Sequence, residues 1–212
     1  VTVVNVPAWA PDTMRTVSPT VGRPDAGGGA PGDSTWMLQR ALERQMTSVA
    51  LGPLWDPIAV ATCLDAGLGA TLGLRIGGKM CPLSGAPVDL TVTVTGIAHD
   101  AYQTFGPGTS PLGDCVAVSG SGIDIVLNSL RTQAYGPELF TNVGIDPARR
   151  NVVIVKSTQH FYAGFAPIAA EVVYVGAPGV VAPAYHELTF NKAQRPRWPF
   201  DDDEPQIRLI AG

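Results

Sequence analysis

The chain has 212 residues, of which 45% are hydrophobic and only 15% are charged, and its formal net charge is −4. This length and apolar content suffice for one large domain or two small ones, and they exclude an intrinsically disordered chain, which combines low hydrophobicity with high net charge. The acidic balance disfavours a general nucleic-acid binder. The most apolar stretch, 161–185, is interrupted by Glu171 and three prolines, so no membrane-spanning segment is expected.

The first segment, 1–26, is expected to be extended and irregular, because prolines recur from Pro7 to Pro24 and prevent a long helix. Beyond Ser34, four apolar residues recur at the spacing of one helix face: Leu38, Ala41, Leu42 and Met46. This periodicity predicts an amphipathic helix whose apolar stripe packs on the core.

A second helix is predicted from the signals at its two ends. Asp56 is a favourable N-cap residue followed by proline at the first helical position, and Gly67 provides a C-terminal stop. These signals predict a helix at Ile58–Ala66, after a short apolar strand at Val49–Leu51. Asp56 is therefore expected to act as a helix cap rather than as an acid catalyst.

Most of the remaining regular structure is expected to be strand. The segments with strand patterns are Ala70–Ile76, Val88–Val94, Val116–Ser119, Ile123–Leu127, Asn151–Val155 and Glu171–Val175. Val88–Val94 alternates apolar and polar residues, which indicates a half-buried strand, and Gly120–Gly122 predicts an antiparallel hairpin. The expected fold class is α/β or α+β, with a mixed β-sheet and flanking helices. Residues 201–212, which begin with the acidic run 201–204, are expected to form a partly flexible tail.

The most unusual motif is the glycine-rich run at 27–35, directly before the first helix. Gly27–Gly29 allow the backbone to approach a ligand closely, and free N–H groups at a helix start attract anions. The spacing is similar to that of a phosphate-binding loop, but Asp33 stands where that loop needs its lysine, which disfavours a nucleotide site. A structural alternative is that Asp33 or Ser34 caps the helix and the glycines form a turn.

Two polar runs, Ser129–Gln133 and Lys156–His160, each come directly after a predicted strand. Ligands of open α/β sheets bind at the carboxyl ends of strands. Lys156 and His160 have the chemistry to polarise a carbonyl or donate a proton, and Arg131 has the geometry to bind a carboxylate through two hydrogen bonds. The alternatives are a capping turn with a solvated lysine and a partly packed histidine for the second run, and a surface ion pair for Arg131.

Residue types that bind zinc are few in this sequence. The histidines are His99, His160 and His186, and the cysteines are Cys63, Cys81 and Cys115. No two histidines have metal-ligand spacing and no CxxC pair exists, so no complete zinc site is expected and no metal ligand is assigned. The cysteines are odd in number and widely spaced, which predicts reduced and mostly buried thiols, as in a cytosolic protein.

Seven segments, taken together and in order, resemble one family. They are Gly27–Thr35, Ala50–Val60, Leu74–Lys79, Pro82–Asp89, Arg131–Gln133, Val155–Phe161 and Arg195–Asp201. They resemble the C-terminal domain of the microcystinase C (MlrC)-type metallopeptidases. The resemblance runs from about Gly27 to Asp201, and it places that domain at 27–200.

The resemblance implies a zinc-dependent amide or peptide hydrolase, bacterial and cytoplasmic, in which an N-terminal domain carries most or all of the metal ligands. The chain would then be the pocket-completing C-terminal domain, inactive by itself. Its implied partners are that N-terminal domain, a peptide or small amide substrate and a second copy in a homo-oligomer, but no nucleic acid or membrane. The alternative is a non-catalytic module that binds a small anion or carboxylate, or that mediates dimerisation.

Residues at matching motif positions are expected, from the resemblance, to complete the substrate pocket. The catalytic candidates are Lys156 and His160, and the substrate-binding candidates are Gly27, Gly28, Gly29, Asp33, Ser34, Arg131, Gln133, Ser157 and Gln159. Two departures from the family pattern bear on specificity. Pro24–Ala26 replaces the usual Asp-Asn-Pro before the glycines, and Tyr162 stands where arginine is usual.

Overall fold

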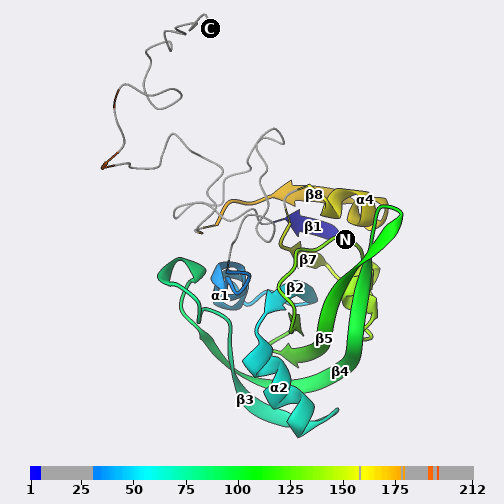
Figure 1. The fold of residues 1–212 in the computed structure, drawn as a ribbon. Helices are drawn as coiled ribbons and strands as arrows, with labels where there is room; N and C mark the ends of the chain where they lie inside the picture. Colours follow the sequence, from blue (N-terminus) through cyan, green and yellow to red (C-terminus); the bar gives the residue numbers. More distant parts are fainter. Residues whose placement is uncertain (6–30, 158, 178, 180–190, 193–194, 196–212) are drawn as a thin grey trace, which may run out of the picture.

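The structure is a computed structural model that describes residues 1–5, 31–157, 159–177, 179, 191–192 and 195. These residues form one eight-stranded mixed sheet with helices on both faces (Figure 1). The strand order is β3-β4-β5-β6-β2-β7-β1-β8. The predicted fold class, a mixed sheet with flanking helices, is confirmed.

One half of the sheet is parallel and the other half is antiparallel. The strands are β1 Thr2–Asn5, β2 Val49–Trp55, β3 Thr71–Ile76, β4 Val88–Phe105, β5 Gly108–Gly120, β6 Ile123–Asn128, β7 Val152–Val155 and β8 Glu171–Tyr174. The neighbours β6-β2-β7-β1-β8 pair in parallel, whereas β3-β4-β5-β6 pair antiparallel. The parallel half therefore places the carboxyl ends of five strands along one edge of the sheet.

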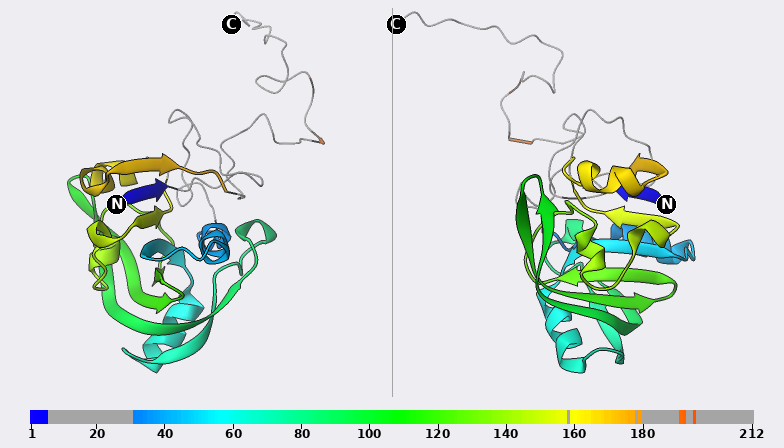
Figure 2. Two further views of the ribbon diagram at one scale, coloured as in Figure 1. Left: turned by 180° about the vertical axis from the view of Figure 1, so that it is seen from behind. Right: turned by 90° about the vertical axis from the view of Figure 1, so that its right-hand side faces the viewer.

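Helices cover both faces of the sheet. They are α1 Trp36–Glu43, α2 Pro57–Ala66, α3 Glu138–Thr141 and α4 Phe161–Phe165, with short 3-10 turns at Pro82–Ser84, Pro147–Arg149 and Ala166–Ile168. Buried residues of α1 and α2 belong to one hydrophobic cluster, and those of α3 and α4 belong to another. In β2, Val49 and Leu51 face the first cluster and Ala50 faces the second, because side chains alternate along a strand. The sheet curves around α2 (Figure 1, Figure 2).

The predicted helices and strands are confirmed, and their end signals act as expected. The Asp56 carboxylate accepts a hydrogen bond from the Ala59 N–H at 3.1 Å, and Pro57 is the first residue of α2. Gly67 ends that helix with a φ of 82°. The predicted hairpin joins β5 and β6 in antiparallel register.

Strand β2 is longer than predicted. The sequence places its end at Leu51, because glycine and proline usually end a strand, yet β2 continues through Gly52 and Pro53 to Trp55. A register shift against β6 between Leu51 and Leu54 accommodates the two residues. Through this extension, Trp55 and Asp56 lie at the carboxyl edge of the sheet.

The expectation of irregular structure over 1–26 is wrong at its start. Thr2–Asn5 forms β1 between β7 and β8, and the side chain of Val3 is completely buried there. The β-branched residues 1–4 favour a strand, and its partners β7 and β8 lie about 150 positions or more further along the chain. Residues 6–26 and the predicted acidic tail, 201–212, lie outside the described residues.

Within the described part of the chain, no helix has both the length and the apolar character that crossing a membrane requires. All three cysteines are free thiols, and Cys63 and Cys115 are buried. Burial, with a contribution from Asp114, raises the pKa of the Cys115 thiol to about 12, and burial also raises the pKa of Cys63. Both thiols therefore stay protonated at neutral pH, consistent with the predicted role as apolar core residues.

A pair of glycine substitutions tests the packing of β4. A Cβ added at Gly96 would overlap the carbonyl oxygen of Val143, in the loop after α3. We expect Gly96→Ala to lower the free energy of unfolding by about 2 kcal/mol, because overpacking forces β4 away from that loop. Urea unfolding measures this change.

Gly73→Ala is the matched control, because a Cβ at this position in β3 meets nothing within 4 Å. It is expected to change the free energy of unfolding by less than about 1 kcal/mol. Equal losses of stability in the two variants would contradict the described contact between β4 and Val143.

Candidate functional site

Three parallel strands end side by side at one edge of the sheet, β6, β2 and β7. A polar residue follows each of them: Asp56 comes directly after β2, Arg131 follows β6, and Lys156 comes directly after β7. Open sheets of this kind bind their ligands at such an edge. The candidate site is therefore built from these turns and from the segment before α1.

The carboxylate of Asp33 fixes the segment before α1 against the loop after β3. It is buried and accepts hydrogen bonds from the backbone N–H of Lys79 at 2.7 Å, the N–H of Met80 at 2.8 Å and the hydroxyl of Ser84 at 2.6 Å. The N-cap position of α1 is Thr35, which makes no side-chain capping bond. The alternative in which Asp33 or Ser34 caps this helix is therefore wrong.

Asp56 is confirmed as the cap of α2, and its carboxylate also binds the loop after β3. It accepts a hydrogen bond from the Gly77 N–H at 2.8 Å, and it forms an ion pair with the Lys79 ammonium at 2.5 Å. Gly77 has a φ of +54°, and a Cβ there would lie 2.6 Å from the carbonyl oxygen of Asp33, so only glycine fits. The two carboxylates thus hold one loop from two sides.

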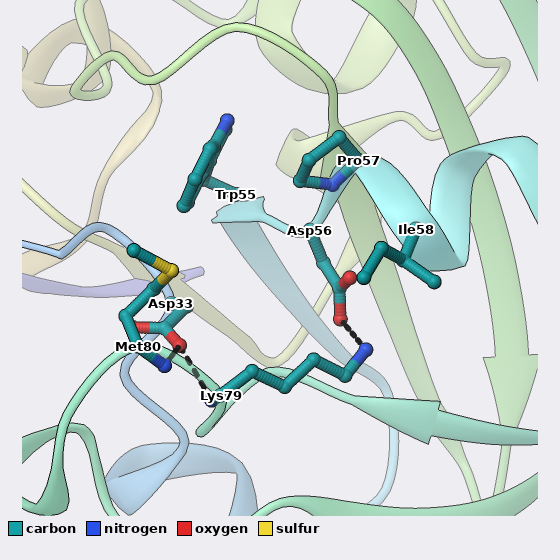
Figure 3. Close-up of a pocket in the computed structure, with 7 residues that line it drawn as sticks. All are labelled: Asp33, Trp55, Asp56, Pro57, Ile58, Lys79 and Met80. Atoms are coloured by element: carbon teal, nitrogen blue, oxygen red, sulfur yellow. Dashed lines mark hydrogen bonds and ion pairs between the residues drawn. The ribbon is translucent and has the colours of Figure 1, made fainter.

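A pocket of about 110 Å³ opens between these groups (Figure 3). Its lining consists of Asp33, Trp55, Asp56, Pro57, Ile58, Lys79 and Met80. Sequence reasoning did not single out Trp55 or Met80, because neither belongs to a polar motif. A signal for Trp55 exists: it ends an apolar run directly before the N-cap residue Asp56, which places it at the end of a strand.

Arg131 lies over the ring of Trp55. Its guanidinium carbon is 4.1 Å from the centre of the indole, a cation–π arrangement, and the indole N–H donates to the Ser129 carbonyl at 2.9 Å. Within the described part of the chain, the guanidinium makes no hydrogen bond and no ion pair, and the side chain is exposed. The predicted alternative of a surface ion pair is not seen among these residues.

Lys156 holds the end of the glycine-rich segment. Its ammonium donates a hydrogen bond to the carbonyl oxygen of Gly32. The same oxygen accepts a hydrogen bond from the backbone N–H of Trp55 at 3.0 Å. Lys156 is buried, so the predicted alternative of a solvated lysine is wrong. Gly32 has a φ of +80°, and a Cβ there would lie 3.2 Å from the Arg131 side chain. The structure therefore brings Lys156, Arg131 and the last part of the glycine motif together.

Gln133 and Ser157 are both buried and bind each other. The Ser157 hydroxyl donates to the Gln133 side-chain oxygen at 2.9 Å. The Gln133 carbonyl accepts from Gln103 at 2.7 Å, and its side-chain amide donates to the Tyr135 hydroxyl at 3.2 Å. These contacts join the turn after β6 to the turn after β7 and to β4.

Gln159 and His160 lie in surroundings different from those of Lys156. Gln159 accepts a hydrogen bond from the Tyr174 hydroxyl at 3.0 Å and lines a hollow of about 580 Å³ next to β8. Burial raises the pKa of Tyr174. The ring of His160 is exposed and packs edge-on against Phe105, with ring centres 5.1 Å apart, at the tip of the β4–β5 hairpin.

The remaining predicted site residues are Ser34 and the three glycines Gly27–Gly29. Ser34 is half-buried just before α1, whereas Gly27, Gly28 and Gly29 lie outside the described residues. Among the residues that the structure describes, no group of three or more His, Cys, Asp or Glu side chains is arranged to hold a metal ion. The described donor set therefore does not fit zinc.

A family model described as "MlrC C-terminus" matches residues 25–192. The chain belongs to this family. The resemblance drawn from the sequence motifs is thereby confirmed. The match contains the segment before α1, both carboxylates, Arg131 and Lys156.

Two relatives of the MlrC C-terminus chain extend this finding. Microcystinase C of Sphingomonas sp. is 38% identical over 175 residues, which are 82% of this chain and 34% of that protein. A crystal structure named "Putative metallopeptidase", from Mesorhizobium sp. BNC1, superposes with a TM-score of 0.74 at 25% identity, over 95% of this chain and 38% of that chain. The chain thus spans little more than a third of the length of each relative.

The buried carboxylate of Asp56 is expected to carry much of the stability of this edge. Asp56→Ala removes the α2 cap, leaves the Gly77 N–H without its acceptor and separates Lys79 from its counter-ion. We expect the free energy of unfolding to fall by about 3 kcal/mol, as when one partner of a buried ion pair is removed. Urea unfolding of the variant and the wild type measures the difference.

Asp89→Ala is the control, because Asp89 pairs with Arg75 on the surface, where both side chains are more than 60% exposed. An exposed ion pair contributes little to stability, so the free energy of unfolding of this variant should be close to that of the wild type. If Asp56→Ala behaved like Asp89→Ala, the carboxylate would not hold the loop after β3.

Proposed function

We propose that the chain is the C-terminal domain of a zinc-dependent amide or peptide hydrolase and that it completes the substrate pocket. An N-terminal domain would carry the metal ligands. Family membership supports this, as do relatives whose names are those of a microcystinase and a metallopeptidase and which are about two and a half times as long. Among the described residues no group of three or more His, Cys, Asp or Glu side chains is arranged to hold a metal ion, so the proposal assigns the ligands to that other domain.

The observation that carries this proposal is the arrangement of Arg131, Trp55 and Lys156 at the carboxyl edge of the sheet. Arg131 makes no hydrogen bond to the described residues, and its guanidinium carbon lies 4.1 Å from the centre of the Trp55 ring. A guanidinium in this position binds a substrate carboxylate through two parallel hydrogen bonds. Lys156 holds Gly32 next to both, since its ammonium binds the Gly32 carbonyl and a Cβ at Gly32 would lie 3.2 Å from Arg131 and 3.3 Å from Trp55.

His160 is the candidate proton donor in this proposal. Its ring is exposed, is held by contact with Phe105 and Tyr135, and belongs to the short segment that follows Lys156. An imidazole within reach of the scissile amide has the chemistry to protonate a leaving amine. Gln159, next to it, has an amide able to orient the substrate peptide group.

A non-catalytic carboxylate-binding module is the second candidate. The guanidinium of Arg131, which has no hydrogen-bond partner among the described residues, favours it, because carboxylate binding there needs no metal and no other domain. The two functions differ in whether the chain needs a second domain that carries metal ligands. The hydrolase requires a reading frame that continues upstream of Val1 into a domain with His and Asp ligands.

Zinc content separates the hydrolase domain from a self-sufficient metalloenzyme. The 212-residue chain, dialysed against zinc and then against buffer, is expected to retain none, because its described residues offer no ligand group. The protein that includes the N-terminal domain is expected to retain zinc after the same treatment. Stoichiometric, tightly bound zinc in the 212-residue chain would contradict the placement of the ligands in another domain.

The proposed roles of Arg131 and His160 predict a kinetic effect in the protein that includes the N-terminal domain. Arg131→Ala or His160→Ala is expected to reduce turnover by about 10²-fold, the usual effect of losing an acid–base or charge-stabilising group. Steady-state hydrolysis of a peptide substrate measures this. Arg44→Ala, at the exposed end of α1, is the control and should leave turnover unchanged. A folded Arg131 or His160 variant with wild-type kinetics would rule out that residue's role.

A further inference from the structure

The pocket beside Trp55 and the guanidinium of Arg131 together have the form of a two-part subsite. We propose that the pocket takes an aliphatic side chain of the ligand and that Arg131 binds a carboxylate of the same ligand. The ligand class is thus a peptide or amino-acid derivative that carries an aliphatic side chain next to a free carboxylate. The inference rests on the proposed function only in treating that ligand as a substrate.

The walls of the pocket are mainly apolar. The indole of Trp55, the ring of Pro57 and the side chains of Ile58 and Met80 line it (Figure 3). The volume is about 110 Å³. An apolar cavity of about 150 Å³ accommodates benzene, so this pocket suits a branched aliphatic side chain better than an aromatic ring.

The charged groups of the pocket disfavour an ionised side chain. The Lys79 ammonium is already paired with Asp56 and also donates to the Arg75 carbonyl at 2.8 Å, so its aliphatic stem runs along the pocket (Figure 3). The Asp33 carboxylate has three donors of its own. A carboxylate in the pocket would lie beside two acids, and an ammonium would displace Lys79.

Two pocket residues are unusually exposed for apolar side chains. Ile58 is 68% exposed and Met80 is 50% exposed, and they lie on opposite sides of the opening (Figure 3). A ligand side chain that enters the pocket removes apolar surface of both from water, and each buried methylene raises the affinity about fourfold. This exposure therefore favours an apolar occupant.

The carboxylate position follows from Trp55. The same indole lines the pocket and carries the Arg131 guanidinium at 4.1 Å. The guanidinium and the pocket are thus neighbours of one ring, and the proposed ligand places its carboxylate on the first and its side chain in the second. Stacking occupies one face of the guanidinium and leaves its N–H edges free for the two oxygens of a carboxylate.

Calorimetric titration of the 212-residue chain tests the subsite with three probes. N-acetyl-L-leucine carries both recognised groups, N-acetyl-L-leucinamide lacks the carboxylate, and N-acetylglycine lacks the side chain. We expect N-acetyl-L-leucine to bind at least tenfold more tightly than either of the others. Equal affinities for the three probes, or no binding of N-acetyl-L-leucine, would overturn the proposal.

Two variants assign the two halves. Arg131→Gln should abolish the preference for leucine over leucinamide while keeping the preference for leucine over glycine. Ile58→Ala should abolish the preference for N-acetyl-L-leucine over N-acetylglycine while keeping the preference for N-acetyl-L-leucine over N-acetyl-L-leucinamide. The matched controls are Arg44→Gln and Leu68→Ala. Arg44 is an exposed arginine at the end of α1, and Leu68 is 69% exposed outside the pocket.

A change in both preferences with either control variant, or in neither with Arg131→Gln, would overturn the assignment. These measurements involve no hydrolysis and no zinc. If the chain binds the probes as expected but the protein with its N-terminal domain has no amidase activity, the proposed function fails and the subsite stands. If the protein with its N-terminal domain hydrolyses a peptide but the 212-residue chain shows neither binding preference, the subsite proposal is wrong and the proposed function stands.

Discussion

Two buried carboxylates, those of Asp33 and Asp56, hold together the edge of the sheet on which the candidate site lies. Each accepts three hydrogen bonds, and each binds Lys79, Asp33 through the backbone N–H and Asp56 through the ammonium. A buried carboxylate is unfavourable without such donors, so these contacts stabilise the observed arrangement of the loop after β3, the start of α2 and the segment before α1. The pocket and the position of Trp55 both depend on it.

The division of the sheet into a parallel and an antiparallel half determines which groups meet. The parallel half brings the turns after β2, β6 and β7 to one edge, where Arg131 and Lys156 meet at Gly32. The antiparallel half extends β4 and β5 into a long hairpin whose tip contacts His160. The two catalytic candidates, Lys156 and His160, therefore face different surroundings, one buried and bonded to a loop and the other exposed on an aromatic pair.

Part of the candidate site could be predicted from the sequence because strand ends are visible in it. Arg131 and Lys156 were found from the change of apolar strand to polar turn, and both lie at the predicted edge. The same pattern also selects Gln133 and Ser157, which point inward and bind each other, since a run of polar letters does not reveal which side chain faces the protein. Trp55 and Met80 were missed because apolar pocket residues resemble core residues.

By itself, the sequence determined the ends of α2, the alternation in β4, the hairpin between β5 and β6 and membership of the MlrC C-terminus family. These features depend on neighbouring residues or on ordered motifs, which a linear chain displays directly. Only the tertiary structure decided that Thr2–Asn5 enters the sheet, that Asp33 binds the Lys79 N–H 46 positions away, and that Arg131 stacks on Trp55. The reason is that the partners of these groups are distant in sequence, so the contacts form only once the fold has brought the separate segments together.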